Sequence, residues 1–198
     1  RQNGGTPVKV DSIPGSSSSL DFGYQTIPDM YSVIAVNTAT GCTNNQFGTA
    51  TVVENPLPNV YSTGGGGNYC AGDTGVIVTL NNSDFGFRYQ LYTAGLPIDF
   101  PRDGGYGALD FGGQTTAGTY TILSTDLSTG CSRYMSGSVN VVVNPLPVTY
   151  SVSIPGGINS YCAGDAGLHI VTGGSSIGVD YQLYNNGNPI GAVMSGTG

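Results

Sequence analysis

The sequence has no tryptophan and few charged residues. Only 9% of the 198 residues are charged, five of them Lys or Arg, whereas about a quarter is usual. The five basic residues are scattered along the chain, so no cluster could neutralise successive phosphates. We therefore expect no nucleic-acid partner, and the net charge of −7 also disfavours anionic membrane surfaces.

Long hydrophobic runs and helical patterns are missing too. No apolar run approaches the about 18 residues that span a bilayer, so we expect no membrane span. No stretch combines helical periodicity with capping residues. Instead, 33 glycines and 11 prolines separate short apolar runs, a composition typical of short strands joined by turns. The sequence therefore predicts an all-β chain.

The chain contains an internal repeat. Five motifs recur in the same order at a shift of 89 or 92 residues: Asn-Pro-Leu-Pro at 55–58 and 144–147, Tyr-Cys-Ala-Gly-Asp at 69–73 and 161–165, Tyr-Gln-Leu-Tyr at 89–92 and 181–184, Leu-Asp-Phe-Gly at 20–23 and 109–112, and Thr-Gly-Cys at 40–42 and 129–131. A period near 90 residues is too long for a solenoid turn and fits an array of small domains.

This period divides the chain into three units. Residues 55–143 form one complete repeat, residues 1–54 the C-terminal part of the preceding repeat, and residues 144–198 the N-terminal part of the next. The complete repeat contains about seven short strands, the spacing of an antiparallel sandwich, with 64–67 as a flexible crossing. We expect stiff, extended linkers between the units, because proline fixes φ and lacks a backbone donor. The linker prolines are Pro56, Pro58, Pro145 and Pro147.

Two tyrosine positions favour an immunoglobulin-like sandwich. Tyr120 begins the sixth strand, where a tyrosine corner is expected, and Tyr31 holds the same place one repeat earlier. Tyr89 and Tyr181 stand where a buried aromatic residue anchors the core. Ordinary packing of strand tyrosines is the alternative. The prediction is tandem immunoglobulin-like antiparallel β-sandwiches joined end to end.

The incomplete units at both ends need a complement. Half a sandwich exposes strand edges and an uncovered apolar face. Either the 198 residues are a window onto a longer chain, or the missing strands come from a neighbouring subunit. The two partial units are complementary, so head-to-tail strand donation is physically feasible.

Taken together, the Pro-Leu-Pro linker and the Tyr-Cys-Ala-Gly-Asp, Tyr-Gln-Leu-Tyr, Ala-Gly-Thr-Tyr and Thr-Gly-Cys motifs resemble tandem immunoglobulin-like repeats of giant Bacteroidota surface proteins. Gliding-motility adhesins and filaments exported by the type IX route belong to that group. The resemblance covers the whole chain. It implies an extracellular, cell-surface stalk or adhesin whose partners are neighbouring repeats or subunits of the same fibre, and it identifies no ligand.

The four cysteines suit an oxidising, extracellular setting. Cys70 and Cys131 belong to one repeat, and a bond between them would close a 61-residue step, contributing about 4 kcal/mol. A bond between neighbouring repeats is the alternative, because the first loop and the last hairpin of a seven-strand sandwich lie at opposite ends. Under either scheme Cys42 and Cys162 lack partners within these residues. Four free thiols are a third alternative.

No enzyme, cofactor or metal site is expected. The Gly-Ser-Ser-Ile-Gly stretch at 174–178 lacks the strand-to-helix turn and His partner of a hydrolase. The single histidine, His169, has no partner for acid-base or metal chemistry. The aspartates fall singly in turns, which leaves calcium between repeats as a minor alternative. They include Asp73, Asp84, Asp103, Asp126 and Asp165.

Two residues are candidates for glycosylation. Ser12 lies in an Asp-Ser-Ile acceptor pattern, which resembles Bacteroidota O-glycosylation sites, and Asn81 begins an Asn-Asn-Ser sequon. A carbohydrate- or protein-binding module of a secreted protein is the second functional hypothesis, with Tyr92, Tyr106 and Tyr184 forming a platform for surface glycans.

Overall fold

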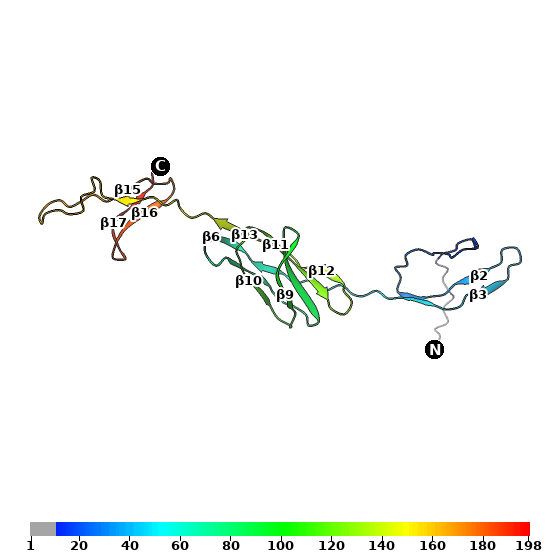
Figure 1. Cartoon of the computed structure of the whole chain (residues 1–198). Helices are drawn as coiled ribbons and strands as arrows, with labels where there is room; N and C mark the ends of the chain where they lie inside the picture. Colours follow the sequence, from blue (N-terminus) through cyan, green and yellow to red (C-terminus); the bar gives the residue numbers. More distant parts are fainter. Residues whose placement is uncertain (1–10) are drawn as a thin grey trace.

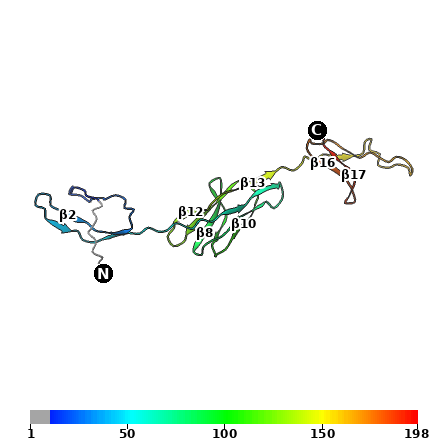
Figure 2. The ribbon, with the colours of Figure 1, turned by 180° about the vertical axis from the view of Figure 1, so that it is seen from behind.

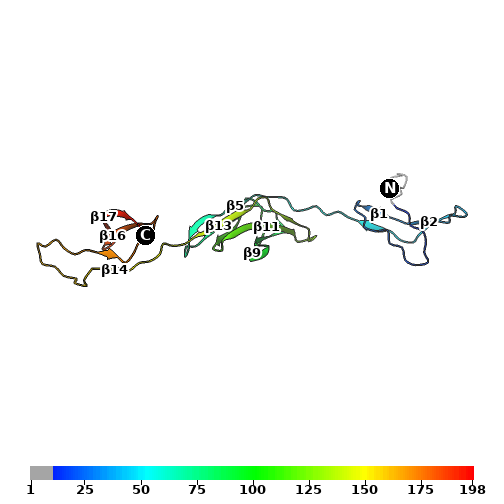
Figure 3. The same ribbon diagram turned by 90° about the horizontal axis from the view of Figure 1, so that it is seen from above.

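A computed structural model describes residues 11–198, so the first ten residues of the predicted 1–54 unit lie outside the described residues. Three parts of the chain lie in a row (Figures 1, 2 and 3). We call them the N-terminal segment (11–54), the central unit (55–143) and the C-terminal segment (144–198). All regular structure in the described part is β, and it contains no helix that could cross a membrane.

The strands are short. The N-terminal segment contains β1 (Asp29–Tyr31), β2 (Ile34–Val36), β3 (Thr43–Asn45) and β4 (Ala50–Val52). The central unit contains β5 (Thr63–Gly65), β6 (Gly67–Cys70), β7 (Val76–Leu80), β8 (Phe87–Thr93), β9 (Leu96–Asp103), β10 (Leu109–Gln114), β11 (Gly118–Asp126), β12 (Ser132–Tyr134) and β13 (Val139–Asn144). The C-terminal segment contains β14 (Val152–Ser153), β15 (Val171–Thr172), β16 (Asp180–Asn185) and β17 (Asn188–Ser195).

Two sheets form the central unit. One has the order β10-β7-β5, and the other has the order β6-β13-β11-β8-β9. The short strand β12 pairs with the C-terminal part of β11. All pairs of named strands are antiparallel except β6 with β13, which is parallel. An isolated parallel bridge also joins Ser62 to Ser136. This two-sheet, predominantly antiparallel arrangement is consistent with the predicted β-sandwich.

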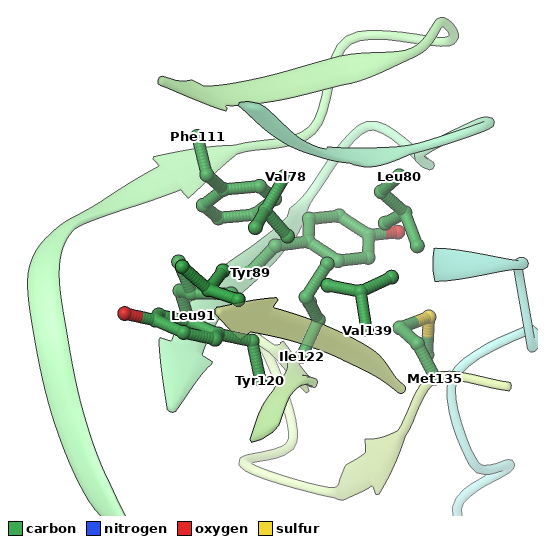
Figure 4. Close-up of a cluster of buried hydrophobic side chains, with 10 residues drawn as sticks. Val78, Leu80, Tyr89, Leu91, Phe111, Tyr120, Ile122, Met135 and Val139 are labelled. Carbon is green, nitrogen blue, oxygen red and sulfur yellow. The ribbon is translucent and has the colours of Figure 1, made fainter. Parts of the chain in front are cut away.

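The core lies between these sheets (Figure 4). Alternate residues of β8 and β11 face inward, as strand geometry requires: Tyr89, Leu91, Tyr120 and Ile122 are all fully buried. Val78 and Leu80 of β7 cover them from the opposite sheet. Burial of one such side chain contributes about 1.5–3 kcal/mol, so this cluster accounts for much of the stability of the central unit. The remaining core members are Phe111, Met135, Val139 and Val141.

Two buried tyrosines make polar contacts, one of which is the predicted tyrosine corner. The hydroxyl of Tyr120 donates to the carbonyl of Thr116 over 2.7 Å, four residues upstream, which is the geometry of a tyrosine corner. The hydroxyl of Tyr89 accepts from the backbone N–H of Asp84 over 2.9 Å. The same bonds recur outside the central unit, from Tyr31 to Ile27 and from Ser176 to Tyr181.

The predicted crossing at 64–67 is present, but most of it is strand and not a flexible loop. Gly64 and Gly65 belong to β5 and Gly67 begins β6, and the chain passes from one sheet to the other between them. Gly65 has φ +90°, and a Cβ there would lie 2.0 Å from the carbonyl oxygen of Ile77. The glycines therefore allow two strands to approach closely and change sheets. The short strands β6 and β12 bring the central unit to nine strands instead of about seven.

Strand registers recur along the chain at the spacing of the sequence repeat. The β1–β4 pairing places Tyr31 opposite Ala50, as the β11–β13 pairing places Tyr120 opposite Val139. The β2–β3 hairpin likewise repeats the register of β11–β12, and β16–β17 repeats that of β8–β9. The flanking segments thus have the same local hydrogen bonding as matching parts of the central unit.

Candidate assembly groove and joint cysteines

The C-terminal segment contains an apolar groove. Its volume is about 630 Å³, and it lies between the β14–β15 pair and the β16–β17 pair. Leucine, isoleucine, valine, methionine and tyrosine side chains dominate its walls. They include Val148, Tyr150, Val152, Ile170, Val171, Tyr181, Leu183 and Met194. An apolar groove of this kind is unfavourable in water and suits a protein occupant.

The groove corresponds to the core of the central unit. Leu183 matches Leu91, the third residue of the Tyr-Gln-Leu-Tyr motif, and Ile170 matches Val78. Leu91 and Val78 are fully buried, whereas Leu183 and Ile170 are 41% and 52% exposed. The difference arises because β11 and β13 cover the first pair, and no strand in the C-terminal segment takes their place.

The strands that fill this space in the central unit have counterparts in the N-terminal segment. Tyr120 and Ile122 of β11 correspond to Tyr31, which ends β1, and Val33, which lies just after it. The hydroxyls of Tyr31 and Tyr120 make the same bond to a carbonyl four residues upstream. Ile122 is fully buried, and Val33 is 38% exposed. Each flanking segment therefore carries the apolar face that would cover the other.

Linker prolines show the same contrast. Pro58 is fully buried against the central unit, whereas Pro147, its counterpart, is exposed, as are Pro56 and Pro145. The chain around them has no regular strand between β4 and β5 or between β13 and β14. Pro147 therefore has no cover in the C-terminal segment like that of Pro58 in the central unit.

Cys70 and Cys131 lie at opposite ends of the central unit. Cys70 ends β6 and is level with Asn144, whereas Cys131 lies in the β11–β12 turn, where its carbonyl accepts from the N–H of Asp126. Along β11 and β13, the positions of Cys70 and Cys131 are about eleven residues apart, which corresponds to roughly 36 Å. A disulfide needs a Cα separation below about 7 Å. This fold therefore does not accommodate the predicted Cys70–Cys131 bond.

The other two cysteines occupy equivalent places in the flanking segments. Cys42 lies in the β2–β3 turn, where its carbonyl accepts from Asn37 as that of Cys131 does from Asp126. Cys162 lies in the loop between β14 and β15. Cys42, Cys70 and Cys162 are exposed and Cys131 is partly buried; none of them is bonded to another described cysteine.

The aspartates of the central unit serve local contacts. Asp84 accepts from the Tyr61 hydroxyl over 2.6 Å and from the Asn59 amide over 2.9 Å. Its hydrogen bond raises the pKa of Tyr61 above 10. These contacts fix the start of the unit to the β7–β8 loop. Within residues 11–198 no three His, Cys, Asp or Glu side chains gather as metal ligands.

Asp103 and Asp126 have lowered pKa values. Asp103 accepts from Arg88 over 2.8 Å on the surface, and this hydrogen bond lowers the pKa of its carboxyl below the ordinary value. Asp126 accepts from the hydroxyl and N–H of Ser128, which lowers its pKa in the same direction. Asp126 closes the turn that presents Cys131. Asp73 and Asp165 follow Cys70 and Cys162 in exposed turns.

The other predicted positions lie apart from one another. Ser12 and His169 are exposed, and 174–178 lies between β15 and β16. Asn81 is exposed, but its Oδ1 accepts from the N–H of Ser62. The hydroxyl of Ser83, the third sequon residue, is fully buried and donates to Gly107. Modification of Asn81 would therefore have to precede folding.

The predicted tyrosines form no single platform. Tyr92 is half-buried and packs edge-on against Tyr134. Tyr106 is 77% exposed and stacks on Phe85, with ring centroids 6.2 Å apart. Tyr184 belongs to the C-terminal segment.

Sequence reasoning anticipated the uncovered apolar faces but missed the two parallel contacts. The β6–β13 pairing places Cys70 level with Asn144, and the Ser62–Ser136 bridge joins the end of the β12 segment to the chain before β5. No sequence signal marks a short parallel pairing. No known protein family matches the chain, and no curated protein matches it either.

Proposed function

We propose that the chain is a structural segment of an extracellular, repetitive surface fibre or adhesin stalk. In this proposal immunoglobulin-like sandwiches are strung end to end through prolyl linkers, and they act as spacers without catalysis or a cofactor. The recurrence of strand registers at the repeat spacing carries the proposal. A chain that repeats one fold along its length gains reach with each copy.

Features of the central unit support an immunoglobulin-like sandwich. Two sheets enclose one core, Tyr120 makes a tyrosine corner, and Tyr89 anchors the core on the third predicted strand. The elongated arrangement in Figures 1 and 3 supports the spacer role. With about 3.3 Å per residue along a strand, one unit with its loops would extend the fibre by roughly 35–45 Å.

The flanking segments support head-to-tail assembly. The groove of the C-terminal segment would receive β1 and β4 of an N-terminal segment, as β11 and β13 fill the core of the central unit. Val33 and Leu183, exposed in the separate segments, would then be buried like Ile122 and Leu91. This covering removes apolar surface from water and provides the driving force.

Assembly is tested by light scattering and electron microscopy of the chain under reducing conditions. We expect concentration-dependent rods with a regular axial repeat. Leu183→Asp, which places a charge in the groove, will abolish them. Ile177→Asp is the matched control, because Ile177 is 81% exposed and does not line the groove. A chain that stays monomeric at all concentrations, or a compact particle, would contradict head-to-tail assembly.

The extracellular location is tested separately. The low charge and the four cysteines favour an oxidising exterior. Antibodies against the central unit should label intact cells. Labelling only after permeabilisation would contradict an exterior location.

A binding module remains the second candidate, and the exposed Phe85–Tyr106 pair favours it. Stacked aromatic rings on a surface offer a flat apolar face to a sugar ring. Glycan-array binding that is lost on Tyr106→Ala but kept on Tyr134→Ala would support this function. Absence of binding on the array would leave the spacer as the sole proposal.

A further inference from the structure

The cysteines flank the linkers between units. Cys70 lies level with Asn144, the first residue of the second Asn-Pro-Leu-Pro linker, because β6 pairs in parallel with β13. The N–H of Ala71 donates to the carbonyl of Asn144 over 2.8 Å, which holds this cysteine one strand away from the linker. Its position is thus fixed at the end of the central unit that faces the C-terminal segment (Figure 1).

Cys131 lies at the other end, and the chain that follows it runs beside the chain that follows the first linker. Ser136 pairs in parallel with Ser62, and the N–H of Ser136 donates to Tyr61 over 2.8 Å. Five residues before Ser136 is Cys131, and five residues before Ser62 is Leu57. If both segments run extended, Cys131 is about level with Leu57, within the Asn-Pro-Leu-Pro linker.

Applied to one linker, these registers bring the two cysteine types to neighbouring levels. The Cys70 type is level with the linker asparagine, and the extended-chain count places the Cys131 type of the following unit level with the linker leucine, two residues further on. Two residue steps correspond to about 7 Å along the linker, the upper limit of the Cα separation that a disulfide bridges. By contrast, Cys70 and Cys131 of one unit are roughly 36 Å apart.

We propose that a disulfide crosses each prolyl linker, between the β6-type cysteine of one unit and the hairpin cysteine of the next. This inference rests on the proposed fibre of tandem units. For two chains arranged head to tail, Cys70 of the leading chain pairs with Cys42 of the following chain, and Cys162 of the leading chain pairs with Cys131 of the following chain. Every cysteine of the sequence then has a partner.

The hairpin orientations fit this pairing. The β2–β3 hairpin, which carries Cys42, points away from the central unit, and the loop between β14 and β15, which carries Cys162, extends away on the other side (Figures 1 and 2). In a head-to-tail arrangement both reach toward the neighbouring chain. Cys42 and Cys162 are exposed, so an oxidant can reach them.

The bonds need an oxidant of the disulfide class. Two thiols and one molecule of oxidised glutathione give one protein disulfide and two molecules of reduced glutathione, by two successive thiol-disulfide exchanges. Two such reactions would link each pair of neighbouring chains covalently.

The test is oxidation of the 198-residue chain with oxidised glutathione, followed by thiol blocking. We expect a ladder of multimers on a non-reducing gel that collapses on reduction. Because the chain has only five basic residues, chymotryptic peptides are better suited to mass spectrometry. A mixture of ¹⁴N- and ¹⁵N-labelled chains should give Cys42–Cys70 and Cys131–Cys162 peptides that contain both isotopes, which proves bonding between copies. In longer native material, the same pairing within one chain would give peptides of a single isotope.

Two double variants remove equal numbers of thiols but give opposite results. Cys42→Ser with Cys70→Ser deletes one pair and leaves Cys131–Cys162, so the ladder persists. Cys42→Ser with Cys162→Ser deletes one member of each pair, so the ladder disappears, although Cys70 and Cys131 are both present. A Cys70–Cys131 peptide in that variant would overturn the proposal.

Failure of the disulfide and failure of the fibre are distinguishable. Rods that form while all thiols still react with a blocking reagent overturn the disulfide and leave the fibre intact. Monomers with free thiols at all concentrations overturn both. Ladders with scrambled pairing overturn the stated partners.

Discussion

Leu91 and Leu183 hold the same place in the Tyr-Gln-Leu-Tyr motif but differ in exposure, so alanine substitutions will have different effects. Leu91 is fully buried in the central core. Leu91→Ala removes buried methyl groups and leaves a cavity, which costs about 2–5 kcal/mol. In a unit of about 90 residues, this lowers the melting temperature by roughly 10 °C or more.

Leu183→Ala acts mainly on assembly. Leu183 keeps 41% of its surface exposed in the groove. Covering that fraction is worth about 0.6–1.2 kcal/mol of the roughly 1.5–3 kcal/mol for a fully buried leucine. Its loss should weaken head-to-tail association by about 3- to 8-fold in Kd, while the melting of the dilute chain changes little.

Calorimetry at low concentration and sedimentation equilibrium over a range of concentrations measure the two effects. We expect Leu91→Ala to shift the main melting transition at every concentration, and Leu183→Ala to shift only the association curve. If Leu183→Ala lowers the melting temperature of the dilute chain as much as Leu91→Ala does, Leu183 belongs to a folding core and not to an assembly surface. If association is unchanged, the groove has no occupant from a second copy.

Three further substitutions or conditions test the central unit. Gly65→Ala should destabilise the central unit by more than about 2 kcal/mol in urea denaturation, because the new Cβ would lie 2.0 Å from the neighbouring strand. Gly105→Ala is the control and should change the stability little, because nothing lies within 4 Å of its Cβ position. Equal effects of the two substitutions would argue against the close approach. Tyr120→Phe removes the tyrosine-corner hydrogen bond and should cost about 1 kcal/mol by the same assay, and an unchanged midpoint would show that the bond contributes nothing. The lowered pKa values of Asp103 and Asp126 stabilise the fold above about pH 4, and this contribution is lost as the pH falls through the folded pKa values. Urea midpoints should therefore drop below pH 4, and they should drop less steeply for Asp126→Asn. A midpoint that rises on acidification would contradict the assignment.

The all-β class, the repeat and two core tyrosines could be predicted from residue patterns alone. Alternation in Tyr-Gln-Leu-Tyr places Tyr89 and Leu91 on one face because side chains alternate along a strand, and both are buried. Tyr120 was identifiable as a tyrosine corner because it begins a strand after a turn. These features are local, so a few neighbouring residues specify them.

The parallel strand pairs and the positions of the cysteines could not be predicted, because they depend on long-range packing. Cys70 and Cys131 look like one disulfide when counted by repeat, yet the register separates them by roughly 36 Å. The glycines at 64–67 suggest flexibility, yet Gly65 serves a tight passage between sheets. Both outcomes depend on contacts between residues distant in sequence, and local sequence patterns do not specify such contacts.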